Sequence, residues 1–215
     1  MSNRLTQARM TFEHRIDEAA DFVARCKTGR HGTVNRSLFV VNQLEWAHEI
    51  AVLKIVVASE NFFEQTFGLY VLGKRTATGF RVGRLRRNIS SSLPQILQIF
   101  RGDRNFIGWV EPTEIIERAA RWLKGGEPYQ TTLTSTSQLL VYVKKMRNVI
   151  AHESDDAIEK YEKATRNLYG ALPKRVSPGA QLIQPPPPAI PYLNGATLFE
   201  AILGTYRLIG QRIVP

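Results

Sequence analysis

The chain has 215 residues, and 43% of them are hydrophobic, which is enough to bury the core of one domain and excludes a disordered chain. Its single cysteine, Cys26, excludes an intramolecular disulfide and a zinc site built from several cysteines. The longest apolar stretch, 51–58, is interrupted by Lys54 and is too short to cross a bilayer. No secretory signal is expected at the N-terminus, so the simplest expectation is a cytoplasmic protein without membrane contact.

The net charge of +10 is concentrated in one part of the chain, residues 74–110. This segment holds one acid, Asp103, and eight basic residues: Lys74, Arg75, Arg81, Arg84, Arg86, Arg87, Arg101 and Arg104. Such a segment is typical of proteins that bind polyanions, with nucleic acid the first expectation and an anionic membrane the second. The alternative is a solvated arginine-rich loop that only keeps the protein in solution.

The first third of the chain predicts two helices. Apolar residues at helical spacing indicate a helix over 5–26, within an N-terminal helix and turn that occupies 1–34. No proline interrupts 35–70, so a long helix is expected there, with Asn35 as its N-cap. Long unbroken helices suggest a bundle, and the basic segment 74–110 then reads as an insertion in it.

The middle of the chain predicts further helical elements. Residues 93–100 form a short apolar segment, and 112–123 read as a helix that Pro112 can start. Residues 131–137 are a polar lead-in with several candidate caps, followed by a second long helix over 139–169.

The C-terminal part departs from this pattern at 174–192. Residues 177–180 read Ser-Pro-Gly-Ala, a turn that could close a small β-hairpin, and the prolines at 185–188 require extended backbone. A last helix is expected over 196–211. The prediction is therefore an all-α fold over a single domain, 1–215, with long antiparallel helices and one minor hairpin and proline-rich excursion.

Several classes of enzyme are disfavoured by what the sequence lacks. No two of its four histidines have zinc-ligand spacing, there is no Gly-rich phosphate loop, and no serine lies in a nucleophile elbow. We therefore expect no metal and no cofactor. The histidines are His14, His31, His48 and His152.

One short motif, Arg147–His152, places polar groups on a single face of the long helix over 139–169. At about 100° per residue, Arg147, Asn148, His152, Lys144 and Lys145 all fall within one arc. The opposite arc is apolar and is expected to face the core. It consists of Leu139, Tyr142, Val143, Met146, Val149 and Ile150.

The three motif side chains have complementary chemistry. The guanidinium of Arg147 can contact a phosphate with two hydrogen bonds. The imidazole of His152 can exchange a proton near neutral pH. The amide of Asn148 can orient either of them. Together they are suited to reactions at a phosphodiester.

The spacing alone is not specific. An Arg and a His five residues apart also occur at 9–14, where we take the match to be chance. The alternative for the later copy is a surface arginine and a helix histidine that pairs with Glu153 or Asp156.

Residues 147–152, Arg-Asn-Val-Ile-Ala-His, resemble the Arg-polar-x-x-x-His signature of HEPN domains. Upstream, 58–64 resembles the acid-plus-aromatic pattern on an early long helix of that family, with Glu60 as the matching acid. The order of parts over 38–208 also agrees, and the chain is most similar to the group labelled RiboL-PSP-HEPN. Only 147–152 is specific in this comparison.

The resemblance implies a dimeric helical bundle that cleaves RNA without a metal. In such a domain the ribose 2′-hydroxyl attacks the adjacent phosphodiester to give a 2′,3′-cyclic phosphate. His152 would act as general base or acid, Arg147 would stabilise the phosphoryl charge, Asn148 would fix the geometry, and Glu60 would orient Arg147 or His152. Many such proteins are toxins or antiviral effectors, so a cognate antitoxin or a defence-system protein is an expected partner, beside RNA and a second copy of the chain.

We expect RNA to be bound by cations on the motif helix and in the basic segment. These residues are Lys144, Lys145, Arg81, Arg84, Arg86 and Arg87. Trp109 borders the basic segment and is a candidate for stacking on a base, whereas Trp46 and Trp122 are expected in the core.

Two other functions remain open. One is an RNA-binding HEPN module in which the basic segment binds but no chemistry follows. The other is a helical scaffold or regulatory dimer, for which no salt-sensitive affinity for RNA is expected.

Overall fold

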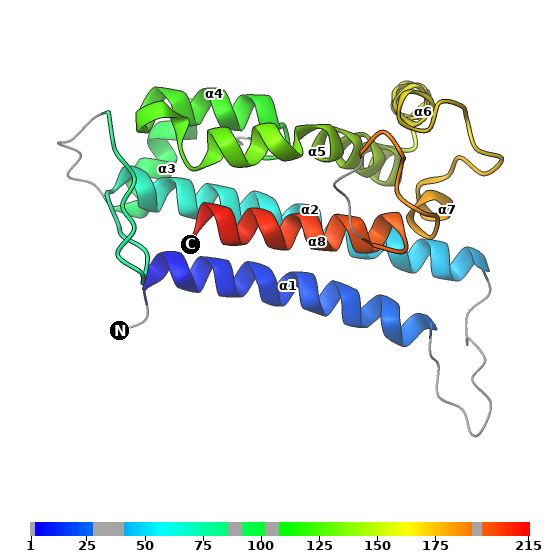
Figure 1. Ribbon diagram of the computed structural model, residues 1–215, viewed down its shortest axis with the longest axis horizontal. Coiled ribbons are helices and arrows are strands. Elements are labelled where there is room, and N and C mark those ends of the chain that lie inside the picture. The colour runs from blue at the N-terminus through cyan, green and yellow to red at the C-terminus, as the bar shows by residue number, and fades with distance from the viewer. Residues whose placement is uncertain (1–2, 28–40, 86–91, 102–107, 191–194) are drawn as a thin grey trace. The chain divides into compact units, whose positions relative to one another are not determined.

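A computed structural model describes residues 3–27, 41–85, 92–101, 108–190 and 195–215 (Figure 1). These residues form α1 (Arg4–Lys27), α2 (Val41–Val71), α3 (Leu93–Arg101), α4 (Pro112–Trp122), α5 (Tyr129–His152), α6 (Asp155–Tyr169), α7 (Pro178–Leu182) and α8 (Leu198–Ile213), with a 3-10 turn, η1 (Lys124–Gly126), before α5. The all-α prediction is confirmed. The expected N-cap Asn35 lies outside the described residues. None of the helices described has the length and apolar character to span a membrane.

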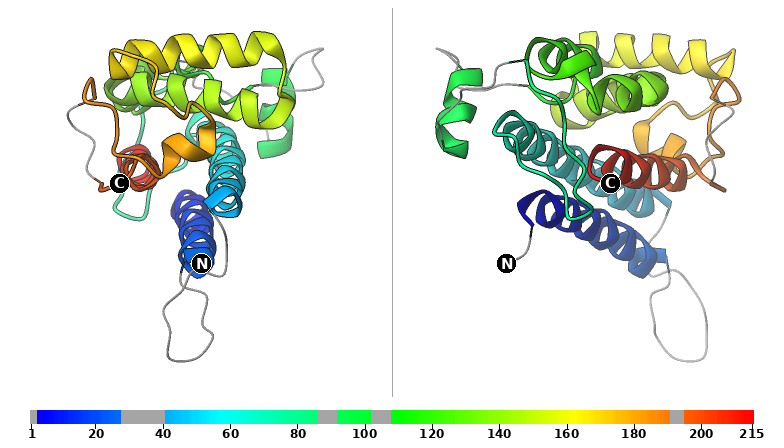
Figure 2. Two further views of the ribbon diagram at one scale, coloured as in Figure 1. Left: turned by 90° about the vertical axis from the view of Figure 1, so that its right-hand side faces the viewer. Right: turned by 60° about the vertical axis from the view of Figure 1, so that its left-hand side comes forward.

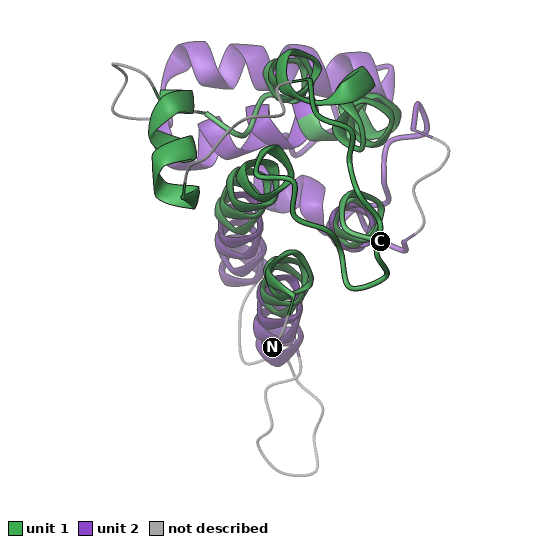
Figure 3. Ribbon diagram, turned by 90° about the vertical axis from the view of Figure 1, so that its left-hand side faces the viewer, with its two compact units in different colours: residues 1–14, 57–140, 207–215 green, residues 15–56, 141–206 purple. Residues whose placement is uncertain are grey.

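The chain divides into two compact units (Figure 3). Unit 1 comprises 1–14, 57–140 and 207–215, and unit 2 comprises 15–56 and 141–206. The boundaries fall inside α1, α2, α5 and α8, so each of these helices contributes residues to both units. The sequence predicted a single domain and carried no signal for this division, because no linker separates the units.

Aromatic side chains form the core of unit 1. Phe12 of α1 stacks on Phe62 of α2, with ring centroids 4.6 Å apart. Phe67, one and a half turns further along α2, contacts Tyr129 of α5 at 5.6 Å and Trp109 at 5.4 Å. Each of these large rings buries a large apolar area, and burial of apolar surface is the main favourable term in folding.

The loop 72–85 follows α2 (Figure 2), and its residues take part in two isolated backbone bridges. Arg75 pairs with Arg81, which closes the loop on itself, and Arg84 pairs with Leu123 after α4. Thr78 donates a hydrogen bond of 3.3 Å to the carbonyl of the last residue of the chain, after α8. The described residues of the predicted basic insertion 74–110 thus include an ordered loop with isolated bridges and the helix α3, and no strand occurs among them.

Unit 2 is built around α5 and α6. Tyr142 of α5 stacks on Tyr161 of α6 with centroids 5.5 Å apart, and their hydroxyls are 3.2 Å apart. Thr165 lies 3.1 Å from the Tyr142 hydroxyl, so these buried polar atoms satisfy one another. The predicted apolar stripe of α5 is buried except for Ile150, which is half-buried.

The prediction of one helix over 139–169 is wrong at both ends of α5. The helix begins at Tyr129, so the polar lead-in 131–137 is helical. Thr132 and Thr136 within it are four residues apart, and their side chains are buried on one face of the helix. It ends at His152, where Glu153 takes a left-handed conformation with φ of 46°. Ser154 then caps α6 by accepting a hydrogen bond of 3.3 Å from the backbone N–H of Ala157.

The predicted β-hairpin over 174–192 is also wrong. Residues 178–182 form α7 instead, and no β-strand occurs among the described residues. Ser177 accepts a hydrogen bond of 3.3 Å from the N–H of Ala180, and Pro178 occupies the first helical turn. Ser-Pro is therefore a cap followed by a favourable first helical residue, a pairing that starts a helix as readily as a turn.

The structure reverses two of the three tryptophan predictions. Trp46, expected in the core, is 62% exposed on α2. Trp109, the candidate for base stacking, is 2% exposed and lies under the guanidinium of Arg118, 4.3 Å from its ring centroid. Its faces are therefore already in contact with protein, which leaves no room for a base. Trp122 is half-buried and contacts Phe100 edge to face at 5.2 Å.

Candidate active site

The motif lies on the last turns of α5 within unit 2. Met146 and Val149 face the core, which directs Arg147 and Asn148 toward the half-buried side of the helix. His152 is the last residue of the helix and is exposed. The sequence prediction that polar and apolar side chains separate on this helix is confirmed.

The structure brings the three predicted motif residues together. Nη1 of Arg147 donates hydrogen bonds to Oδ1 of Asn148, at 3.3 Å, and to Nε2 of His152, at 3.4 Å. Residues five apart do not normally meet on a helix, since the neighbours on one face are three or four apart. The long arginine side chain spans the extra distance at the point where α5 ends.

No carboxylate among the described residues forms an ion pair with Arg147. Within the part of the chain that the structure describes, its hydrogen-bond partners are the amide oxygen of Asn148 and an imidazole nitrogen of His152. His152 makes no ion pair with Glu153 or Asp156 among these residues, and Asp156 pairs with Lys160 at 2.7 Å instead. The specific pairings that would have made the motif an ordinary surface feature are therefore not formed.

Glu60, the acid that the resemblance assigned to the motif, is half-buried on α2 and belongs to unit 1. Its role beside Arg147 or His152 stays a prediction.

An acid that the sequence analysis missed, Glu49, belongs to unit 2. Burial raises the pKa of its carboxyl, a hydrogen bond from the Gly179 N–H lowers it, and the charges of Glu45 and Glu153 raise it again. The carboxylate of Glu49 therefore interacts electrostatically with Glu153, the residue directly after His152. A signal existed: Glu49 and Glu60 are eleven residues apart, about three full turns of helix, so α2 presents both on nearly the same face.

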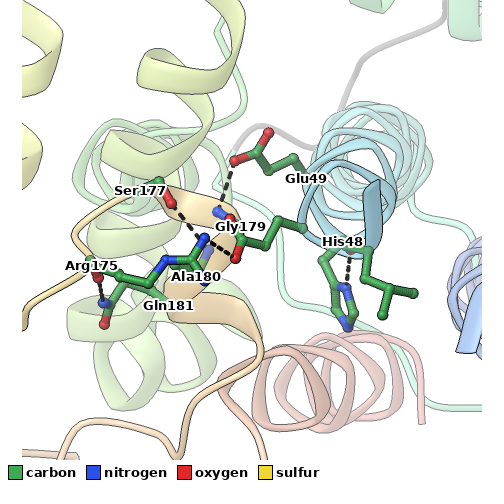
Figure 4. Close-up of polar contacts among 9 residues, drawn as sticks. His48, Glu49, Arg175, Ser177, Gly179, Ala180 and Gln181 are labelled. Atoms are coloured by element: carbon green, nitrogen blue, oxygen red, sulfur yellow. Dashed lines mark hydrogen bonds and ion pairs between the residues drawn. The ribbon is translucent and has the colours of Figure 1, made fainter. Parts of the chain in front are cut away.

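Glu49 and Glu45 anchor α7 to α2 (Figure 4). Oε1 of Glu49 accepts a hydrogen bond of 2.8 Å from the backbone N–H of Gly179, and Glu45 forms an ion pair of 2.6 Å with Arg175. Glu45 is only 6% exposed, so this pairing supplies the counter-charge that a buried carboxylate requires. The backbone of α7 approaches α2 so closely that a Cβ on Gly179 would lie 2.5 Å from Cβ of Glu45.

His48 directly precedes Glu49 on α2, and its side chain is fully buried and points toward α8 (Figure 4). Its Nδ1 donates a hydrogen bond of 2.6 Å to the carbonyl of Leu44, and its ring meets Phe199 edge to face at 5.1 Å. Its Nε2 is buried without a hydrogen-bond partner among the described residues. Burial lowers the pKa of His48, the Leu44 bond opposes this, and the charge of Lys27 adds to the lowering.

The cations predicted to bind RNA have different surroundings. Lys144 and Lys145 are half-buried on α5 in unit 2, and Arg81 is exposed in loop 72–85 of unit 1. Arg86 and Arg87 lie outside the described residues.

Arg84 has a structural contact that its sequence context did not indicate. Its Nη1 donates a hydrogen bond of 3.3 Å to the carbonyl of Val71, and its guanidinium lies against Gly73. A Cβ on Gly73 would be 2.7 Å from Cζ of Arg84. This arginine therefore helps to close the loop after α2, in addition to any contact with RNA.

Among the residues described, no group of three or more His, Cys, Asp or Glu side chains is placed to hold a metal ion. Comparison of the chain with protein-family models, with curated proteins and with solved structures finds no significant match. The evidence for function is therefore the geometry of the motif and the resemblance in its sequence.

Proposed function

We propose that this protein is a metal-independent endoribonuclease of the HEPN type. The observation that carries the proposal is the contact of Arg147 with His152 at the end of α5, with no carboxylate neutralising the arginine in the described part of the chain. An unneutralised guanidinium attracts a phosphate, and an adjacent imidazole can then act on a hydroxyl beside that phosphate.

The reaction requires no group beyond these side chains and the RNA itself. His152 takes the proton of the ribose 2′-hydroxyl, and the 2′ oxygen forms a bond to the adjacent phosphorus. The bond from phosphorus to the 5′ oxygen breaks, and that oxygen leaves with a proton returned by the imidazolium or by water. Arg147 stabilises the negative charge on the phosphoryl oxygens, and Asn148 holds the guanidinium in place. DNA lacks the attacking hydroxyl and is inert.

Each unit, taken by itself, carries cations that are suited to contact an RNA backbone. Lys144 and Lys145 flank the motif on α5, and Lys74, Arg75 and Arg81 are exposed on loop 72–85. Contacts of this kind give affinity without reading sequence. Selection of a particular RNA sequence must therefore come from residues other than these cations.

We further propose that two copies of the chain pair along their motif helices. A single α5 presents Arg147, Asn148 and His152 as an open strip that does not exclude water. Two such strips related by a two-fold axis enclose a cleft, in which electrostatic effects are stronger and two imidazoles are available for two proton transfers. A toxin or antiviral effector controlled by a cognate protein is the biological role that fits a nuclease of this kind.

The test is to incubate the purified protein with total cellular RNA in EDTA and to map the new ends. We expect cleavage to persist and to leave 2′,3′-cyclic phosphate and 5′-hydroxyl ends. Strict dependence on added magnesium, or products with a plain 3′-hydroxyl, would refute the mechanism. RNA binding without cleavage would favour the non-catalytic module, and no salt-sensitive RNA binding would favour the scaffold.

A further inference from the structure

The contact between Arg147 and His152 fixes which nitrogen of the imidazole carries the proton. Arginine has five N–H donors and no acceptor, so Nε2 of His152 must accept the hydrogen bond of 3.4 Å from Nη1. In the neutral ring the proton then lies on Nδ1. The lone pair that could act as a base is on Nε2 and is covered by the guanidinium.

This contact is suited to be displaced. It is long, it lies at the exposed end of α5, and its acceptor is uncharged. A phosphate oxygen is charged and accepts a stronger and shorter bond from the same guanidinium. Asn148, the second acceptor of Nη1, is also neutral and offers no competition from charge.

We propose that Arg147 is both the phosphate ligand and the positioning residue that sets the His152 tautomer, and that phosphate binding uncovers Nε2 as the reacting nitrogen. In the free protein the base is covered. When the phosphodiester draws Arg147 away, the ribose 2′-hydroxyl replaces the guanidinium as the hydrogen-bond donor to Nε2, so the proton of the neutral ring stays on Nδ1. The proton of the 2′-hydroxyl then goes to Nε2, and the second proton of the imidazolium stays on Nδ1. This inference rests on the proposed nuclease function, of which it specifies the substrate-triggered step.

The test reads the tautomer directly by long-range ¹H–¹⁵N correlation spectra of the ¹⁵N-labelled full chain. Spectra are recorded at about pH 8, well above the ordinary pKa of histidine, about 6.5. The chain has four histidines, and the His152 signals are assigned by their loss in His152→Gln. The variant is Arg147→Met, and Arg166→Met, an exposed arginine of α6, is the matched control.

In wild type and in Arg166→Met, His152 should carry its proton on Nδ1. In Arg147→Met the proton of the neutral His152 ring should shift toward Nε2. Inorganic phosphate draws the guanidinium away from Nε2 but brings no ribose hydroxyl to replace it as donor. Titrated at constant ionic strength, it should therefore shift the wild-type His152 signals in that same direction and should leave Arg147→Met unchanged. A wild-type His152 protonated on Nε2, or a wild-type spectrum insensitive to phosphate, would overturn the inference.

The two proposals fail separately. The expected tautomer and phosphate response without any RNA cleavage would defeat the nuclease proposal and leave the Arg147–His152 inference standing. Metal-independent cleavage by a protein whose His152 is protonated on Nε2 would defeat the inference alone.

Discussion

Replacing Gly179 by alanine should destabilise unit 2, because α7 and α2 touch at this residue. The new Cβ would lie 2.5 Å from Cβ of Glu45 and 2.9 Å from its backbone carbon and oxygen. Backbone atoms cannot rotate aside, so α7 must move away from α2. That movement lengthens or breaks the 2.8 Å hydrogen bond from the Gly179 N–H to Glu49.

The magnitude follows from these two effects. Overpacking of a well-packed contact costs about 1–3 kcal/mol, and loss of one hydrogen bond adds about 1 kcal/mol. We therefore expect the free energy of unfolding to fall by about 3 kcal/mol, which lowers Tm by roughly 6–12 °C for a chain of this length. Urea and thermal unfolding followed by far-UV circular dichroism measure both quantities.

The matched control for this variant is Gly108→Ala, where an added Cβ meets nothing within 4 Å and φ is not positive. Its stability should stay within about 0.5 kcal/mol of wild type, as for most surface changes. If Gly179→Ala is as stable as this control, α7 does not pack on α2 as described, and the role given to Gly179 is wrong.

Three further predictions concern pH, exposure and salt. Because burial lowers the pKa of His48 in the folded protein, the unfolded chain binds more protons than the folded chain as pH falls below about 6.5, so the free energy of unfolding should decline there. Urea titrations from pH 8 to 5 should show that the free energy of unfolding changes less with pH in His48→Leu than in wild type. Because Trp46 is exposed, Trp46→Ala should change the free energy of unfolding by less than about 0.5 kcal/mol. A loss of about 3 kcal/mol or more in the same titration would show that Trp46 is a core residue. Changing Lys74, Arg75 and Arg81 to glutamine should weaken RNA binding for all sequences alike and reduce the salt slope measured by fluorescence anisotropy; an unchanged slope would make loop 72–85 merely solvated.

The sequence was most informative where a pattern extends over several turns. The apolar period placed α1 within one residue at each end, and Pro112 marked the start of α4. The helical wheel separated the buried side of α5 from the side that carries Arg147 and His152. Periodicity succeeds in these cases because the core selects one face of each helix.

The sequence was least informative where one or two residues decide between structures. Glu153 and Ser154 end one helix and cap the next, yet both residues are also acceptable inside a continuous helix. Ser-Pro at 177–178 suits a turn and a helix start equally, and the close approach of Gly179 to Glu45 of α2 accompanies the helix. Exposure of Trp46 and the division of acids on α2 between the units likewise depend on tertiary packing, which no local pattern encodes.

The most direct test of the central claim compares two histidine substitutions in one cleavage assay. The rate of RNA cleavage in EDTA is measured for wild type, His152→Ala and His14→Ala, with circular dichroism confirming that each variant is folded. We predict that His152→Ala lowers the rate by about 10²-fold or more, as for loss of a general acid or base, and that His14→Ala leaves it unchanged. Loss of activity in His14→Ala with full activity in His152→Ala would contradict the assignment of the site to the end of α5.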